Sequence, residues 1–199
     1  MGPLRTGFFY GSIAVVVALL ADLRFLLIDP RSIPDWMLAA VEGFRTQFAL
    51  ASYLFLGILA ALRVRPTRLD PDATYRSLLV RDCTLAATVV AVMVGFVLLF
   101  LTALNATLFA DELRVYAGEA APGIAAYDKE VASELDEPPP LPTAEEIERN
   151  LQPPVLWDLG RSITNFVLRA ILLGTLGALV GFLRGRTDAP SSDDKPRVE

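Results

Sequence analysis

Few side chains in this sequence could take part in catalysis or hold a metal ion. The 199 residues include no histidine and one cysteine, Cys83. A Ser-His-Asp or Cys-His catalytic arrangement cannot form without histidine, and one cysteine cannot build a zinc or iron–sulfur site. Asp111 and Glu112 could carry out acid–base chemistry, but no recognisable nucleophile accompanies them. The sequence therefore predicts a protein that is not an enzyme and binds no cofactor or metal.

Two charged residues inside long apolar runs, Asp22 and Arg169, are the remaining candidates for chemistry. An unpaired charge at this depth in a bilayer costs at least about 2.5–3.5 kcal/mol, so each needs a partner or a route to water. At 1.5 Å per residue, Arg169 lies about 5 Å and Asp22 about 7 Å from the midplane, on the same side. Arg169 either extends to the interface, pairs with Asp22, or lines a site for an anionic ligand or lipid headgroup. Arg24, nearer the surface, is expected to extend to the interface.

The elements that must position these residues are four apolar segments, each long enough to cross a hydrocarbon layer of about 30 Å. The chain is 53% hydrophobic with a mean hydropathy of +0.45, more apolar than an ordinary soluble domain. The first segment is interpreted as a retained span, because "LLIDPR" offers no small-x-small cleavage site. The sequence thus predicts an all-α membrane protein with four transmembrane helices, at 7–28, 46–62, 84–106 and 162–183.

The distribution of arginine and lysine predicts the orientation of these helices. The turn 63–83 contains five arginines and the segment 184–199 four basic residues, whereas the loop 107–161 has twelve acidic residues against four basic ones. Basic loops remain on the cytoplasmic side of a membrane. Both termini and the basic turn are therefore expected in the cytoplasm, with the protein in the bacterial inner membrane and the acidic loop outside.

Two transmembrane hairpins, 1–62 and 84–183, make up the expected domain organisation. The first includes an amphipathic interfacial helix at 32–45. Trp36 and Trp157 are expected to anchor the chain at the outer interface. The tail 184–199 has the composition of a disordered segment.

The acidic loop is expected to be partly helical. One short helix is predicted at 124–136, and "PPPLP" should end it because proline lacks an amide donor. Thr143 and Glu146 have the spacing of a capping box, which predicts a second helix running to about Asn150.

Small residues form stripes on the first and fourth expected helices. Lipid gives helices no hydrophobic reason to associate, so close packing of small residues must supply the contact. Such a stripe packs either inside the four-helix bundle or against another protein or a second copy. At 100° per residue, Arg169 points about 130° away from the glycine stripe, so the fourth helix should contact two different neighbours. The candidate packing residues are Gly7, Gly11, Ala18, Gly174, Gly177 and Gly181.

The layout of the chain resembles an uncharacterised bacterial family of four-span membrane proteins, a domain of unknown function. The matching pieces are "RDCTLAATVVAVMVGFVLLF", "TAEEIERN" and "LLGTLGALVGFLRGR". The sequence departs from that layout in its "DEPPPLP" insert and in its arginine-rich, lysine-poor surface. The resemblance implies a four-helix fold and no particular activity.

Two functions are consistent with these observations. The first is a non-catalytic accessory or scaffold subunit that packs against a larger bacterial membrane complex. Its partners would be the bilayer and other membrane subunits, contacted through the face of Gly174, Gly177 and Gly181 or through the acidic loop; nucleic acid is not expected. The alternative is a small oligomeric transporter or channel that uses Asp22 and Arg169.

Overall fold

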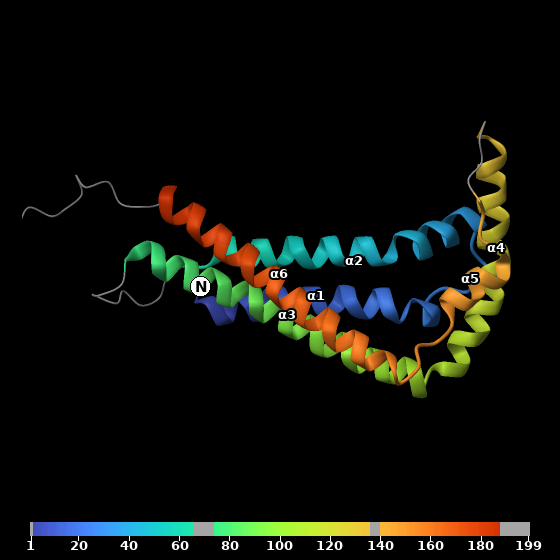
Figure 1. Ribbon diagram of the computed structural model, residues 1–199, viewed down its shortest axis with the longest axis horizontal. Helices are drawn as coiled ribbons and strands as arrows, with labels where there is room; N and C mark the ends of the chain where they lie inside the picture. The colour runs from blue at the N-terminus through green and yellow to red at the C-terminus, as the bar shows by residue number, and fades with distance from the viewer. Residues whose placement is uncertain (1, 66–73, 136–139, 188–199) are drawn as a thin grey trace, which may run out of the picture. The chain divides into compact units, whose positions relative to one another are not determined.

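The computed structural model describes residues 2–65, 74–135 and 140–187. Within these ranges the chain is all-helical, with six α-helices and one short 3-10 helix and without a strand (Figure 1). Four of the helices are long and apolar enough to cross a membrane, which confirms the predicted class at that level. These four are α1 (Pro3–Asp22), α2 (Asp35–Arg63), α3 (Tyr75–Thr107) and α6 (Asp158–Thr187); the others are η1 (Arg24–Leu26), α4 (Ala110–Ser133) and α5 (Ala144–Leu151).

The first two long helices differ from the predicted spans at the end of α1 and the beginning of α2. α1 ends at Asp22, although the apolar run continues to residue 28. α2 runs from Asp35 without a break, so the segment 32–45 is no separate interfacial helix. Pro34 directly precedes this helix, a position where its missing amide hydrogen is no loss. Hydropathy marks where a helix is apolar, whereas the helix itself continues as long as its backbone hydrogen bonds are made.

The other two long helices extend into segments that were predicted to be irregular. α3 begins at Tyr75, inside the predicted turn 63–83. α6 continues to Thr187, so the first residues of the predicted disordered tail are helical. The rest of that tail, 188–199, lies outside the described residues.

The chain divides into two compact units, and each of the four long helices contributes a part to both. Unit 1 consists of Met1–Val15, Ser52–Phe96 and Asn165–Glu199. Unit 2 consists of Val16–Ala51 and Val97–Thr164, and therefore contains η1, α4 and α5.

Within unit 1, two glycines of α6 lie directly against the backbone of α3. A Cβ atom on Gly181 would lie 2.7 Å from the carbonyl oxygen of Leu79, and one on Gly177 would lie 2.7 Å from that of Cys83. A carbon atom cannot approach a carbonyl oxygen this closely without moving the backbone. Only glycine therefore permits this helix contact.

The end of α2 is also fixed within unit 1, by polar contacts. Nη1 of Arg184 donates to the carbonyl oxygens of Ala61 and Val64, at 3.2 and 3.0 Å. The Cys83 thiol donates to the Ala61 oxygen at 3.2 Å. Because the last carbonyls of a helix have no partner in the helix and carry partial negative charge, a cation there stabilises the end of α2.

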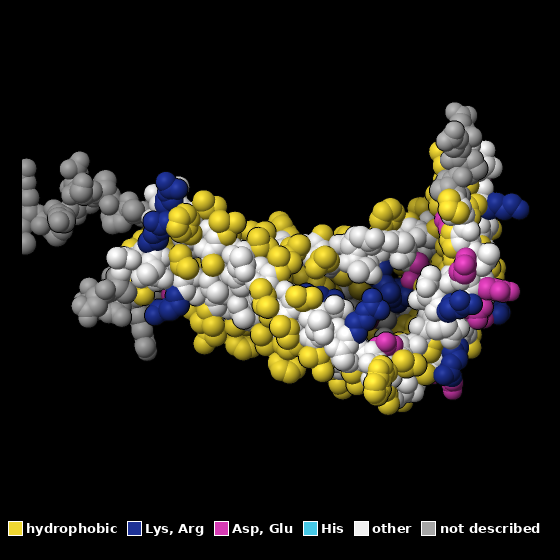
Figure 2. Space-filling model, in the orientation of Figure 1, with side chains coloured by type: hydrophobic (Ala, Val, Ile, Leu, Met, Phe, Trp, Pro, Cys, Tyr) yellow, Lys and Arg dark blue, Asp and Glu magenta, His cyan; other side chains and the backbone are white. Residues whose placement is uncertain are grey.

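Unit 2 has its own hydrophobic core, formed where α4 packs against α5, η1 and the beginning of α2. Apolar side chains from all four elements meet there. In Figure 2, acidic and basic side chains are interspersed over the visible surface of α4 and α5. The buried members of the core are Phe25, Leu38, Leu113, Tyr116, Ala120, Ala121, Ile124 and Ile147.

α4 is much longer than the helix predicted at 124–136, and Pro122 lies inside it. A proline in a helix removes the hydrogen bond to the carbonyl four residues earlier, here that of Gly118. Gly118 and Pro122 are both exposed, so solvent can satisfy the freed carbonyl. The helix continues through the proline to Ser133.

α5 begins as the capping-box spacing predicted. The Thr143 hydroxyl accepts a hydrogen bond from the Glu146 amide at 3.3 Å, and the Glu146 carboxylate accepts one from the Thr143 amide at 2.9 Å. The helix ends at Leu151, and Ile147 is its buried contact with the core. The predicted break at "PPPLP" falls partly outside the described residues.

Candidate functional site

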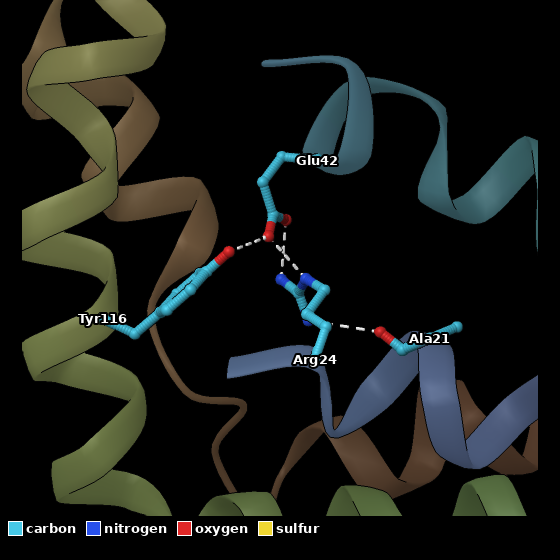
Figure 3. Close-up of polar contacts among 4 residues, drawn as sticks. All are labelled: Ala21, Arg24, Glu42 and Tyr116. Carbon is cyan, nitrogen blue, oxygen red and sulfur yellow. Dashed lines mark hydrogen bonds and ion pairs between the residues drawn. The ribbon is translucent and has the colours of Figure 1, made fainter. Parts of the chain in front are cut away.

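Three polar side chains meet in the interior of unit 2, one each from η1, α2 and α4 (Figure 3). Nε and Nη2 of Arg24 donate to the two carboxylate oxygens of Glu42, at 2.5 and 2.7 Å. The Tyr116 hydroxyl donates to the same carboxylate at 2.7 Å. The side chains of Arg24 and Glu42 are each 6% exposed. This bidentate, desolvated geometry is the strongest form of an arginine–carboxylate contact.

The end of α1 determines where Arg24 lies. The helix stops at Asp22, and the 3-10 turn that follows directs Arg24 toward α2 and α4. Phe25, the next residue, is buried in the core of unit 2. The expectation that Arg24 extends to the membrane interface is therefore wrong: it is buried and paired.

The electrostatics of this cluster act on the Tyr116 hydroxyl. Burial, the hydrogen bond to Glu42 and the charge of that carboxylate raise the pKa of Tyr116 above its usual value near 10. The Arg24 guanidinium lies 5.6 Å from the centroid of the Tyr116 ring and also interacts with its face. Tyr116 therefore stays neutral at physiological pH and acts as a hydrogen-bond donor to Glu42.

Two more charged residues surround the cluster. Arg45 is half-buried, attracted by Glu42 and Asp22 and repelled by Arg24. Asp22, Arg24, Glu42 and Arg45 together carry two positive and two negative charges. The group is neutral overall, as expected where charges are partly withdrawn from water.

An apolar groove adjoins the cluster, entirely within unit 2. Its volume is about 450 Å³, within the range of small-ligand sites. The two arginines are its only charged lining residues. The wall is formed by Val17, Leu20, Ala21, Arg24, Ile28, Ala40, Val41, Phe44, Arg45 and Phe48.

A second cavity, of about 520 Å³, lies between the beginning of α2 and the second half of α4. It combines three carboxylates with two aromatic rings and one apolar side chain, and its Trp36 is 57% exposed. Its lining residues are Asp35, Trp36, Tyr127, Glu130, Val131 and Glu134.

The predicted ion pair between Asp22 and Arg169 rested in part on a similar depth of the two residues in the membrane. Asp22 is the last residue of α1 and belongs to unit 2, near Arg45. Arg169 is half-buried in unit 1. That depth was worked out for a first span that ends at residue 28, whereas α1 ends at Asp22. Their pairing stays a prediction.

The six small residues proposed for helix packing are all buried. Ala18 is buried in unit 2. The other five lie against α3 within unit 1, so the glycine face of α6 is occupied by this chain and not open to another subunit. These five are Gly7, Gly11, Gly174, Gly177 and Gly181.

The two tryptophans proposed as interfacial anchors are both exposed. Trp36 lies at the rim of the acidic cavity, and Trp157 is 92% exposed in the connection between α5 and α6. Their exposure is compatible with an interfacial position, which stays a prediction.

The sequence pattern alone does not indicate the Arg24–Glu42–Tyr116 cluster. One signal was present: Glu42 is a lone carboxylate in an otherwise largely apolar stretch and needs a partner. Among the described residues, no three or more histidine, cysteine or acidic side chains are grouped to hold a metal. The arrangement is suited to holding elements together and to binding by charge and apolar contact.

Comparison of the chain with protein-family models, with curated proteins and with solved structures finds no match. The likeness in layout to a four-span family stays an expectation from the sequence.

Proposed function

We propose that the protein is a non-catalytic accessory or scaffold subunit of a larger bacterial membrane complex. It would lie in the cytoplasmic membrane with both termini inside and the acidic segment 107–161 outside. The observation that carries this proposal is the acidic, aromatic cavity of unit 2. The chain's lack of histidine and its single cysteine are consistent with a binding role.

The lining of this cavity suits a basic side chain of a partner. Asp35, Glu130 and Glu134 offer carboxylates to a lysine or arginine, and Trp36 and Tyr127 offer aromatic faces. A cation over such a ring is attracted by its quadrupole, and a carboxylate nearby adds charge complementarity. Aromatic residues and arginine anchor many protein interfaces in pockets of this kind.

The interior of unit 2 connects the two walls of this cavity. α2 and α4, which form its walls, are tied together by the Glu42–Tyr116 hydrogen bond and by the shared core. A preorganised cavity loses little freedom on binding, which favours affinity. The partner we propose is a membrane subunit with a basic segment on the outer side.

The test is gentle detergent extraction from native membranes, followed by native gel separation and mass spectrometry of the band that contains this chain. We expect migration at high mass with defined partners. The double charge reversal Glu130→Lys with Glu134→Lys should release them. Glu112→Lys with Glu145→Lys makes the same charge change at exposed sites outside the cavity and should leave the complex intact.

Migration of the wild-type chain at the mass of one or a few copies would overturn the proposal and favour transport assays on Asp22 and Arg169 variants. Equal release by both double reversals would show that the cavity is not the docking site.

Orientation can be tested separately because the sequence has one cysteine. Cys83→Ser removes it, and single cysteines are then placed at Arg65, in the basic turn, and at Glu145, in the acidic segment. Only the cysteine at Glu145 should react with a membrane-impermeant maleimide added to intact spheroplasts. Labelling at Arg65 instead would reverse the proposed orientation.

A further inference from the structure

The apolar groove of unit 2 lies on two helices that can cross a membrane. It is lined by the last turns of α1, by η1 and its following loop, and by the first half of α2. Three apolar residues that line it are strongly exposed: the exposed fraction is 56% for Leu20, 68% for Phe44 and 69% for Phe48. On helices that can cross a membrane, we expect large apolar side chains this exposed to face hydrocarbon and the groove to open toward lipid.

The charged residues at the edge of the groove border the uncharged parts of α1 and α2. Arg45 is the last charged residue before an uncharged run of α2 that extends from residue 46 to residue 62. Asp22 marks the end of the apolar helix α1 on the other side of the groove. We expect hydrocarbon to give way to headgroups at this level, where an arginine can meet lipid phosphates.

The two arginines of the groove are not equivalent. Nε and Nη2 of Arg24 are occupied by Glu42. Arg45 interacts with Glu42 and Asp22 by charge only, and in the described part of the chain it forms neither a hydrogen bond nor an ion pair within 4.0 Å. An anion beside Arg45 at the edge of the groove would offset the repulsion between the two arginines.

We propose that this groove binds an anionic phospholipid of the surrounding bilayer. One acyl chain lies against the apolar wall formed by Val17, Val41 and their neighbours, and the phosphate accepts hydrogen bonds from Arg45. Guanidinium and phosphate match as a fork of paired donors and acceptors. The acyl chain fills a groove that water would wet poorly.

The proposal is tested on the full chain purified in mild detergent, with dioleoyl phosphatidylglycerol as the probe. Dioleoyl phosphatidylcholine has the same chains and no net charge, and glycerol 3-phosphate supplies a phosphate without chains. Native mass spectrometry counts bound lipid, and the lipid-dependent rise in unfolding temperature gives apparent affinity. We expect saturable binding of one phosphatidylglycerol and little effect of the other two compounds.

Four variants separate charge from apolar contact. Arg45→Gln should weaken phosphatidylglycerol binding about fivefold, the loss expected for one arginine near an anionic surface. Arg45→Lys should restore part of it. Val41→Trp fills the groove, keeps both arginines and should abolish binding. Arg31→Gln, which removes an exposed arginine outside the groove, should change nothing.

Several outcomes would overturn the proposal. Equal binding of both lipids would remove the role of Arg45, and an equal effect of glycerol 3-phosphate would identify a phosphate site that needs no acyl chain. Unchanged binding in Val41→Trp would place the lipid elsewhere. A two-copy complex without lipid that Val41→Trp disrupts would make a second copy the occupant.

Discussion

Removal of the buried carboxylate by Glu42→Ala should destabilise unit 2 strongly. Arg24 would keep its charge in an interior where it is 5% exposed, and the Tyr116 hydroxyl would lose its acceptor. Breaking one partner of a buried ion pair costs about 3–5 kcal/mol, because the remaining charge is left uncompensated. We expect the free energy of unfolding of unit 2 to fall by about this amount.

The chain offers a separate reporter for each unit. Both of its tryptophans, Trp36 and Trp157, belong to unit 2, so any change of tryptophan fluorescence during thermal unfolding in detergent arises in that unit. The single cysteine, Cys83, is buried in unit 1, so its rate of maleimide labelling follows the opening of unit 1. Glu42→Ala should lower the midpoint temperature of the fluorescence transition strongly and change the rate of Cys83 labelling little.

Two further variants decide whether the buried charge is the cause. Glu119→Ala breaks an exposed ion pair with Arg31, whose side chain is 74% exposed, and should cost less than about 1 kcal/mol. Replacing both partners, Arg24→Met with Glu42→Leu, removes the charge altogether and should be at least about 2 kcal/mol more stable than Glu42→Ala. If the double variant is as unstable as the single one, the uncompensated charge is not the reason.

Three more predictions concern the raised pKa of Tyr116, the glycine contact and the cap of α2. The Tyr116 hydroxyl stabilises unit 2 in its neutral form, so its contribution to the free energy of unfolding is complete below the unfolded pKa of about 10. Above that pH the contribution falls by at most about 1.4 kcal/mol per pH unit. Tyr116→Phe has no hydroxyl, so the midpoint of its fluorescence transition should not show this loss at alkaline pH. Gly181→Ala should destabilise unit 1 by about 1–3 kcal/mol and speed thiol labelling, because its Cβ would meet α3 backbone. Gly43→Ala, in unit 2 with open space around it, should not lower the midpoint of the fluorescence transition of that unit. Arg184→Gln removes the charged donor to the last carbonyls of α2 and should lower the free energy of unfolding of unit 1 by about 1–2 kcal/mol, again measured by thiol labelling. Arg186→Gln, at an exposed site, should change the labelling rate little.

Features that depend on neighbouring residues could be predicted from the sequence. The four long apolar helices follow from composition over some twenty residues, and the beginning of α5 follows from the spacing of Thr143 and Glu146. The length of α4 could not be predicted in this way. Whether a helix continues through Pro122 depends on whether the carbonyl of Gly118 is exposed, which the sequence does not state.

The candidate site could not be predicted because its partners are distant along the chain. Glu42 is 18 residues from Arg24 and 74 from Tyr116, and nothing in their spacing indicates contact. A lone carboxylate in an apolar stretch predicts that some partner exists, not which one. The acidic cavity likewise combines residues of α2 and α4 that only the fold brings together.

The error over Arg24 has a physical origin in how apolar runs are interpreted. Hydropathy placed the end of the first span at residue 28, and α1 ends six residues earlier, a difference of about 9 Å along a helix axis. The apolar residue that follows Arg24 made the run look longer, since Phe25 is hydrophobic whether it contacts lipid or a protein core. It is buried in the core of unit 2. An arginine beside such a residue needs an internal counter-charge instead of a route to the interface, and Glu42 supplies it.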